Sequence, residues 1–302
     1  MTVKFSPEVV IDGFSFTECP RYHDGRVWFV DMHLNRVVSV RPDGSDARTI
    51  EVASAPGGIG WLPDGRLLVV LMQERKILRL DDGEPVVHAD LSASVPTTLN
   101  DLAVDSAGRC YVGETGFDPH PFLVDADDIE NVCRGRFTPP ATSRLFLVEM
   151  DGEYREVASG LAFSNGIVVD ETRNHLFVAE SFGARLTRFR LAPDGGLTER
   201  HELFVDFAPD GIGMDTWGYI WVSDVFGRAA VRIDAEGREI ERVRSERLVL
   251  ACAAGGEHDD QLYLCASPSL DNTECLRLRE SRVEALTIGS PTPAASVRQH
   301  SV

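Results

Sequence analysis

Four oxygen-bearing side chains in this sequence could together hold a hard metal ion. Each begins a short segment that ends in a turn: ECPRYHDG (18–25), NDLAVDSAG (100–108), NGIVVDETRN (165–174) and DGIGMDTWG (210–218). Their first residues supply two carboxylates and two amides, with no imidazole: Glu18, Asn100, Asn165 and Asp210. Such oxygen-only sets suit Ca²⁺, whereas zinc favours His or Cys. We therefore expect a divalent cation, Ca²⁺ ahead of Mg²⁺, Mn²⁺ or Zn²⁺.

Taken singly, each of these residues has a simpler explanation. Asparagine begins many turns, and Pro209-Asp210-Gly211 has the composition of a turn, like Pro63-Asp64-Gly65. Glu18 could be a solvated loop carboxylate. The metal interpretation therefore depends on whether the fold places all four residues in one structural register.

A repeat that runs through the whole chain supplies that fold. Six short apolar segments each follow a polar turn and precede a second stretch of alternating pattern: RVWFVD (26–31), RLLVVL (66–71), RCYVGE (109–114), HLFVAE (175–180), YIWVSD (219–224) and QLYLCA (261–266). The alternation and the Gly, Asp and Pro residues between segments indicate antiparallel strands joined by hairpins.

A further strand precedes each apolar segment, and its copies start at residues 18, 57, 100, 165, 210 and 252. Four strands at a period of ~40–45 residues are typical of propeller blades. We predict a single all-β domain over residues 1–302, a six-bladed β-propeller with four antiparallel strands per blade around a central channel. A sandwich or barrel would not preserve this four-strand unit. The segment near FSPEVVI is predicted to close the last blade as its outer strand.

The first strand of each blade lines the channel of a propeller, so equivalent positions form a ring at one depth. Reading the first position of each copy gives six ring residues: Glu18, Gly57, Asn100, Asn165, Asp210 and Cys252. In this register the four oxygen donors converge beside two small residues, which favours a shared cation over four independent turn residues.

At these residues the chain resembles the family of senescence marker protein (regucalcin), gluconolactonase and luciferin-regenerating enzyme. The resemblance covers nearly the whole chain and rests on five stretches: FTECPRYHDGRVWFVD, GGIGWLPDGRLLVV, LNDLAVDSAGRCYVGETGFD, FSNGIVVD with LFVAESFGARLTRF, and APDGIGMDTWGYIWVSD. It implies a propeller with a channel metal on Glu18, Asn165 and Asp210, and with Asn100 as a fourth ligand or a substrate-facing amide. It also implies hydrolysis of lactones or esters, with Asp210 as general base.

Substrate contacts are expected around the ring. Sugar-lactonase members of the family often carry an arginine where this chain has Thr98, and its loss argues against an aldonolactone substrate without affecting the metal. Glu114 or His33 could serve as base instead of Asp210, which could also attack the substrate directly. The expected substrate-binding set is Thr98, Asn100, Glu114, His33, Phe117 and Phe182, although Phe182 could equally be a core residue.

The 65-residue interval between residues 100 and 165 contains one period plus an insertion at about 117–143. Loops longer than ~12–15 residues are usually functional or disordered. With Phe117, Phe122, Phe137 and several prolines, the insertion is predicted to be a lid over the active site or a dimer contact. The oligomeric state therefore stays open between monomer and homodimer. A flexible tail is expected at about 290–302.

Composition narrows the partners. The net charge of −18 disfavours nucleic acid and anionic membranes. No apolar run reaches the ~20 residues of a membrane span, and the first residues lack the pattern of a secretory signal, so we expect a cytoplasmic protein. The six cysteines contain no CxxC pair, and neither a disulfide framework nor a zinc ribbon is expected.

These observations predict a metal-dependent hydrolase of small-molecule lactones or related esters. The Gly-x-Ser-x-Gly elbow, the Walker A motif and the Rossmann fingerprint are absent from the sequence. Two alternatives stay open: a phosphotriester hydrolase that uses the same metal, and a non-catalytic ligand-binding propeller in which the metal is structural.

Overall fold

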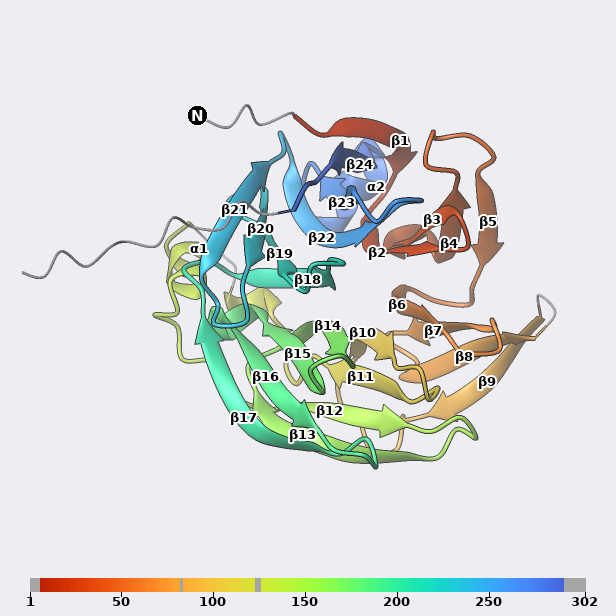
Figure 1. Cartoon of the computed structure of the whole chain (residues 1–302), viewed down its shortest axis with the longest axis vertical. Coiled ribbons are helices and arrows are strands. Elements are labelled where there is room, and N and C mark those ends of the chain that lie inside the picture. Colours follow the sequence, from red (N-terminus) through yellow and green to blue (C-terminus); the bar gives the residue numbers. More distant parts are fainter. Residues whose placement is uncertain (1–5, 82–83, 123–125, 291–302) are drawn as a thin grey trace, which may run out of the picture.

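A computed structural model describes residues 6–81, 84–122 and 126–290. Its strands form six four-stranded antiparallel sheets around a central channel, as Figure 1 shows. The predicted six-bladed β-propeller is confirmed. Blade one consists of β2 (Thr17–His23), β3 (Arg26–Asp31), β4 (Arg36–Val40) and β5 (Arg48–Glu51). Blade two consists of β6 (Pro56–Trp61), β7 (Leu67–Leu71), β8 (Lys76–Asp81) and β9 (Glu84–Asp90). Blade three consists of β10 (Leu99–Val104), β11 (Cys110–Glu114), β12 (Ser143–Val148) and β13 (Tyr154–Leu161).

The other three blades complete the circle. They are β14 (Ser164–Asp170), β15 (His175–Glu180), β16 (Arg185–Leu191) and β17 (Leu197–Phe204); β18 (Pro209–Met214), β19 (Ile220–Asp224), β20 (Ala229–Ile233) and β21 (Glu239–Arg244); and β22 (Leu248–Gly255), β23 (Gln261–Ser267), β24 (Ser281–Thr287) and β1 (Glu8–Phe14). The helices are α1 (Ala126–Cys133) and α2 (Asn272–Leu278), with short 3₁₀ turns η1 (Met32–Leu34), η2 (His120–Phe122) and η3 (Ser181–Gly183).

The circle is closed by strand pairing between the two ends of the chain. β1 pairs antiparallel with β24, with Glu8 opposite Ala285, so the first strand of the sequence completes the last blade. The prediction for the opening segment is confirmed. The inner strands β2, β6, β10, β14, β18 and β22 each contact the next around the channel, and β22 contacts β2. Positions in different blades are therefore held at fixed places around one axis.

Turn residues explain the hairpins that separate the inner strand from the second strand. Asp24 and Gly25 both have positive φ, 49° and 70°, which suits a two-residue hairpin turn between β2 and β3. In blade two, Gly65 has φ 87° and donates its N–H to the carbonyl oxygen of Leu62 at 2.9 Å. Glycine adopts this left-handed conformation at little steric cost, so Pro63-Asp64-Gly65 is a turn as the sequence suggests.

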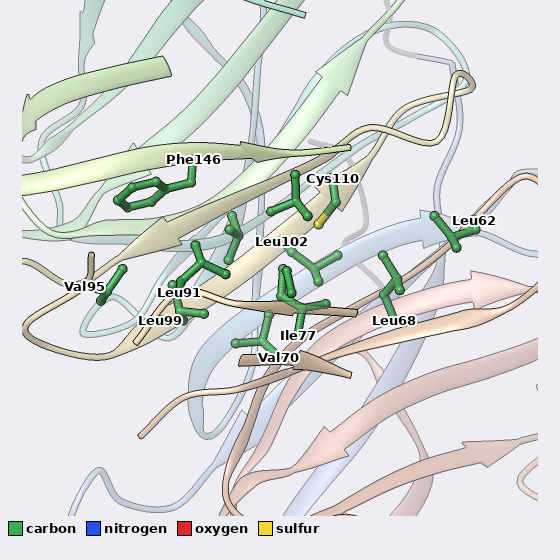
Figure 2. Packing of buried hydrophobic residues seen from close by; sticks show 13 residues of the cluster. Leu62, Leu68, Val70, Ile77, Leu91, Val95, Leu99, Leu102, Cys110 and Phe146 are labelled. Carbon is green, nitrogen blue, oxygen red and sulfur yellow. The ribbon is translucent and has the colours of Figure 1, made fainter. Parts of the chain in front are cut away.

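Apolar side chains fill the wedges between neighbouring blades. Figure 2 shows the cluster between blades two and three, where Val70 and Ile77 meet Leu102, Cys110 and Phe146. All five are at most 2% exposed. Burial of each large side chain contributes about 1.5–3 kcal/mol, so this packing fixes the relative positions of the inner strands.

The remaining expectations about the chain as a whole concern cysteines, membrane helices and the tail. All six cysteines are free thiols, and five are buried. No helix within the described ranges is long and apolar enough to cross a membrane. Apart from residue 290, the predicted tail lies outside the described residues.

Candidate metal centre

The strand register places the four predicted donors at one level of the channel. In blades one, three, four and five, the residue before the donor pairs with the last residue of the second strand: Thr17 with Asp31, Leu99 with Glu114, Ser164 with Glu180, and Pro209 with Asp224. The ladder then shifts register beside each donor. A bulge at this point frees the strand to turn a side chain toward the channel.

The prediction that Cys252 is the ring residue of blade six is wrong. In blade six, Leu248 pairs with Ser267 and Val249 with Ala266, so Val249 is the register equivalent of Glu18, which pairs with Val30. Cys252 lies three residues further along β22. The alignment from the turn failed because β22 extends the ladder: Gly255, its last paired residue before the turn, lies six positions after Val249, whereas Met214 lies four positions after Asp210.

Two glycines explain why the inner strands can approach closely beside the donors. A Cβ at Gly166 would lie 2.5 Å from the backbone nitrogen of Ile212, and one at Gly211 would lie 2.3 Å from Cβ of Ala251. No larger residue fits without moving a neighbouring strand. The Asn165-Gly166 and Asp210-Gly211 pairs therefore belong to strands, and the turn interpretation of Pro209-Asp210-Gly211 is wrong.

Hydrogen bonds orient the two amides. Nδ2 of Asn100 donates to the carbonyl oxygen of Ser164 at 3.1 Å, and Nδ2 of Asn165 donates to Oγ of Ser181 at 3.1 Å. Because the amide nitrogens are engaged with acceptors of the protein, the amide oxygens are the atoms available to a cation.

Electrostatics show that the two carboxylates are close and short of positive charge. Burial raises the pKa of Glu18 well above its usual value, and repulsion from Asp210 raises it further, against the stabilising N–H of Cys19 at 2.9 Å. Burial raises the pKa of Asp210 to about 7; repulsion from Asp101 adds to this, and a hydrogen bond from Asn165 opposes it. A divalent cation between the two carboxylates would replace their repulsion with attraction.

The donor set fits a hard cation. It consists of oxygens from four blades, two of them carboxylate-bearing, which is the chemistry that Ca²⁺ prefers. Within the described ranges, no group of three or more His, Cys, Asp or Glu residues forms a metal-binding cluster. The ring differs from such clusters because two of its four donors are amides.

Sequence reasoning missed a second charged layer directly below the ring. Nη2 of Arg21 lies 3.1 Å from Oδ1 of Asp101, which also accepts a hydrogen bond from the thiol of Cys19 at 3.2 Å. Asp101 is 6% exposed and repels both ring carboxylates. The signal was present in the sequence, since Asp101 follows Asn100 and Arg21 follows Glu18 by three residues.

The structure gives Glu114 a partner that is repeated around the propeller. Glu114 is 1% exposed and forms an ion pair with Arg144. Acids at the same strand end do likewise in other blades: Asp31 with Arg36 at 2.8 Å, Glu180 with Arg185 at 2.8 Å, and Asp224 with Arg242 at 2.6 Å. The repeat indicates a role for Glu114 in holding the second strand of its blade to the strands outside it.

His33 and Thr98 lie in loops on the side of the channel where the donors lie. The imidazole of His33 packs on Phe16 with ring centroids 4.9 Å apart, and its buried Nε2 has no hydrogen-bond partner among the described atoms. Burial lowers the pKa of His33, so it is a neutral imidazole near pH 7. Oγ1 of Thr98 lies 3.1 Å from Oγ1 of Thr115, so its hydroxyl already has a partner within the protein.

Phe117 and Phe182 meet in an aromatic cluster beside the ring. The ring centroid of Phe182 lies 5.2 Å from that of Phe117 and 5.3 Å from that of Phe163. Phe122 and Phe137 of the insertion join them, and α1 packs against η3. The cluster borders a cavity of about 130 Å³ whose lining includes Asn165 and Asp210. The insertion therefore builds one wall of the mouth at which the donors lie.

Comparisons with known proteins agree with this architecture. The chain is 28% identical over 257 residues to Pentonolactonase XacC of Haloferax volcanii, covering 82% of this chain and 80% of the relative. The structure of a luciferin-regenerating enzyme superposes with a TM-score of 0.76 at 19% identity, covering 96% of this chain and 98% of the other.

A calcium-binding protein, regucalcin, from Agrobacterium tumefaciens superposes with a TM-score of 0.74 at 17% identity, covering 94% of each chain. The family model described as SMP-30/Gluconolactonase/LRE-like region matches residues 16–267, which contain all four donors and the insertion. This chain belongs to the SMP-30/gluconolactonase/LRE-like family.

Proposed function

We propose that this protein is a metal-dependent hydrolase of lactones or related esters, with a cation held by Glu18, Asn100, Asn165 and Asp210. One observation carries the proposal: two half-buried carboxylates that repel each other are framed by two oriented amides, next to a cavity that opens at the same mouth. The family supports lactone chemistry, and relatives named a pentonolactonase and a calcium-binding regucalcin support the substrate class and the metal.

A bound divalent cation would polarise the substrate carbonyl as a Lewis acid. Because Ca²⁺ takes ~6–8 oxygen ligands, four protein oxygens would leave room for water and substrate. The residues of the chain supply the rest. Asp210, which lies at the ring and lines the adjoining cavity, is placed to accept a proton from an attacking water. Asn165 donates a hydrogen bond that orients this carboxylate. The aromatic wall limits the access of bulk water to one side of the site.

Metal exchange and a single isosteric substitution test the proposal. Protein stripped with a chelator would be reloaded with Ca²⁺, Mn²⁺ or Zn²⁺ and assayed on lactones, aryl esters and phosphotriesters. We expect hydrolysis of a lactone or ester that disappears with the metal, returns on reloading, and falls at least 100-fold in Asp210→Asn. Circular dichroism would establish that the variant is folded.

Three results would count against the proposal. Turnover that persists in the stripped protein and in Asp210→Asn would remove the metal and the aspartate from the chemistry. A metal-dependent preference for phosphotriesters over every lactone and ester would favour the phosphotriester alternative. Absence of turnover across the panel, with tight metal binding, would favour a non-catalytic propeller.

A further inference from the structure

We propose that the substrate of this site carries an apolar side group, about the size of a phenyl ring or a five- to six-carbon chain, in place of the hydroxyl groups of a sugar lactone. This inference rests on the proposed function and names its substrate class. It comes from the cavity that adjoins Asp210, whose walls are contributed by three parts of the chain: the insertion, the loops of blades four and five, and the loop before α2.

The cavity is apolar on every side except the one that faces the ring. Its polar lining residues are Asn165, Ser181 and Asp210, and none of the described lining residues is a lysine, arginine or histidine. The other walls are formed by residues such as Val132 of α1, Phe182 of η3, Phe163, Ala208, Phe226 and Leu270. An apolar group placed here would lie directly beside the candidate catalytic carboxylate.

The volume sets the size of that group. The cavity measures about 130 Å³. An engineered apolar cavity of ~150 Å³ binds benzene, so a six-carbon ring or a short alkyl chain is the largest group that this cavity holds without displacing a wall. The mouth is open, and the remainder of the substrate can extend toward solvent.

Sugar hydroxyls would find few partners in the same place. Oγ of Ser181 already accepts a hydrogen bond from Asn165, and the hydroxyl of Thr98 is paired with that of Thr115. A hydroxyl group that leaves water for such a wall loses hydrogen bonds that the protein does not replace. The site therefore discriminates against polyhydroxylated lactones, because their hydroxyl groups would lack hydrogen-bond partners in the cavity.

The insertion accounts for the wall. Phe117 packs against Phe182 and Phe163, and Phe122 packs against Phe137 with ring centroids 4.8 Å apart. Val132 of α1 is 2% exposed within this cluster. The extra residues of blade three thus form a packed aromatic layer that continues to the edge of the ring, where a substrate side group would complete it.

A matched pair of lactones tests the inference. The metal-loaded protein would be assayed with a δ-lactone that carries a pentyl or phenyl substituent, and with a pentonolactone and a gluconolactone. We expect kcat/KM at least 100-fold higher for the apolar substrate, because a hydrophobic pocket discriminates by 10–200-fold for each methylene group.

Two leucine variants separate the pocket from general effects. Leu270 lines the cavity and is 40% exposed, whereas Leu276 of α2 is 37% exposed and does not line it. In Leu270→Arg we expect kcat/KM for the apolar lactone to fall at least tenfold; in Leu276→Arg it should stay within twofold. Both positions are exposed, so both variants should fold.

The outcomes distinguish this inference from the proposed function. Metal-dependent turnover with a preference for the sugar lactones, or equal loss in the two leucine variants, would overturn the inference and leave the hydrolase proposal intact. If no substrate is turned over, the hydrolase proposal fails. Calorimetry of 2-pentylcyclopentanone binding then tests separately whether the cavity takes an apolar group. Binding that is weakened by Leu270→Arg but not by Leu276→Arg supports an apolar pocket, and absence of binding overturns it.

Discussion

The two mouths of the channel differ in size and in chemistry. The mouth opposite the ring contains the larger cavity, about 720 Å³, lined by residues that follow the ring positions along the inner strands, such as Arg21, His23 and Trp61. The cavity beside Asp210 is only about 130 Å³. Between them, the Arg21–Asp101 pair occupies the channel. The comparison shows that volume alone does not locate the candidate chemistry, which depends on where unneutralised donors converge.

The balance of charge explains why the candidate chemistry lies at the ring and not at the larger cavity. Below the ring, the carboxylate of Asp101 has a guanidinium partner in Arg21 and a thiol donor in Cys19. At the ring, repulsion between Glu18 and Asp210 raises the pKa of Glu18 beyond the effect of burial. The protein itself neutralises the lower layer, and we propose that a cation neutralises the ring. Each prediction below tests this contrast.

The largest effect should come from removing a charge at the ring. We expect Glu18→Gln to lower kcat/KM by at least 1,000-fold at a fixed Ca²⁺ concentration, which is about 4 kcal/mol of transition-state stabilisation. The reason is that one of the two negatively charged ligands of the cation becomes a neutral amide. His23→Gln, at the opposite mouth, should stay within threefold. Comparable losses in the two variants, measured by steady-state kinetics, would remove the distinction between the mouths.

Breaking the Arg21–Asp101 ion pair below the ring should lower the free energy of unfolding. Arg21→Met leaves Asp101 without its cation beside two further carboxylates, and removal of one partner of a buried pair costs 3–5 kcal/mol. Because the side chain of Arg21 is 21% exposed, we expect about 3 kcal/mol by urea denaturation. The double variant Arg21→Met/Asp101→Asn should regain more than half of this loss. If the double variant loses as much as the single, the unpaired charge is not the cause.

Loss of the Asp210 proton should destabilise the metal-free protein as pH rises. The pKa of Asp210 is raised to about 7 in the folded protein, so between its unfolded value near 4 and pH 7 this group binds more protons in the folded state than in the unfolded state. The contribution of Asp210 to the free energy of unfolding therefore decreases across this window, whereas the lowered pKa values of four histidines act in the opposite direction. Ca²⁺ at 100 times its dissociation constant should add about 2.7 kcal/mol at pH 8 and much less at pH 5.

Thermal unfolding with and without Ca²⁺ at the two pH values measures this effect. An Asp210→Asn variant serves as the control, since it lacks the group whose contribution falls in this window. If the metal-free stabilities of the protein and of Asp210→Asn change equally between pH 4 and pH 7, or if the calcium effect is equal at pH 5 and pH 8, the electrostatic account is contradicted.

The smallest effect is expected at Thr98. Introducing Thr98→Arg should raise kcat/KM for a sugar lactone by a few-fold, less than 1 kcal/mol, since it adds one donor near Asn100 but leaves the apolar wall in place. Thr98→Val controls for loss of the hydroxyl pair with Thr115. An unchanged ratio of sugar-lactone to alkyl-lactone turnover in Thr98→Arg would show that this position does not set specificity.

The fold and the shared register of Glu18, Asn100, Asn165 and Asp210 followed from the sequence because a propeller repeats one unit. The turns at Asp24-Gly25 and Pro63-Asp64-Gly65 punctuate that unit, and an equivalent position in each blade must lie at one depth. The same logic failed where the unit is irregular: the longer paired stretch of β22 in blade six shifted the alignment and put Cys252 in the place of Val249. Turn anchors predict register only when the hairpin length is constant.

The partners of the charged residues did not follow from the sequence. Arg21 and Asp101 each lie close to a ring residue in the sequence, but they are 80 positions apart, and nothing in the repeat pairs them. The acids equivalent to Glu114 end the second strands, but their arginine partners lie at different positions along the chain. The insertion was identified from its length, but the packing of Phe117 on Phe182 depends on how its chain folds back onto blade four. The packing of the insertion arises from three-dimensional contacts that leave no periodic signal in the sequence.

Anomalous diffraction from a crystal soaked in Mn²⁺ tests the central claim most directly. The account predicts one strong peak on the channel axis, within bonding distance of oxygens from Glu18, Asn100, Asn165 and Asp210, and its loss in Glu18→Gln. A strong peak at the opposite mouth, or a channel without any peak at saturating Mn²⁺, would contradict it.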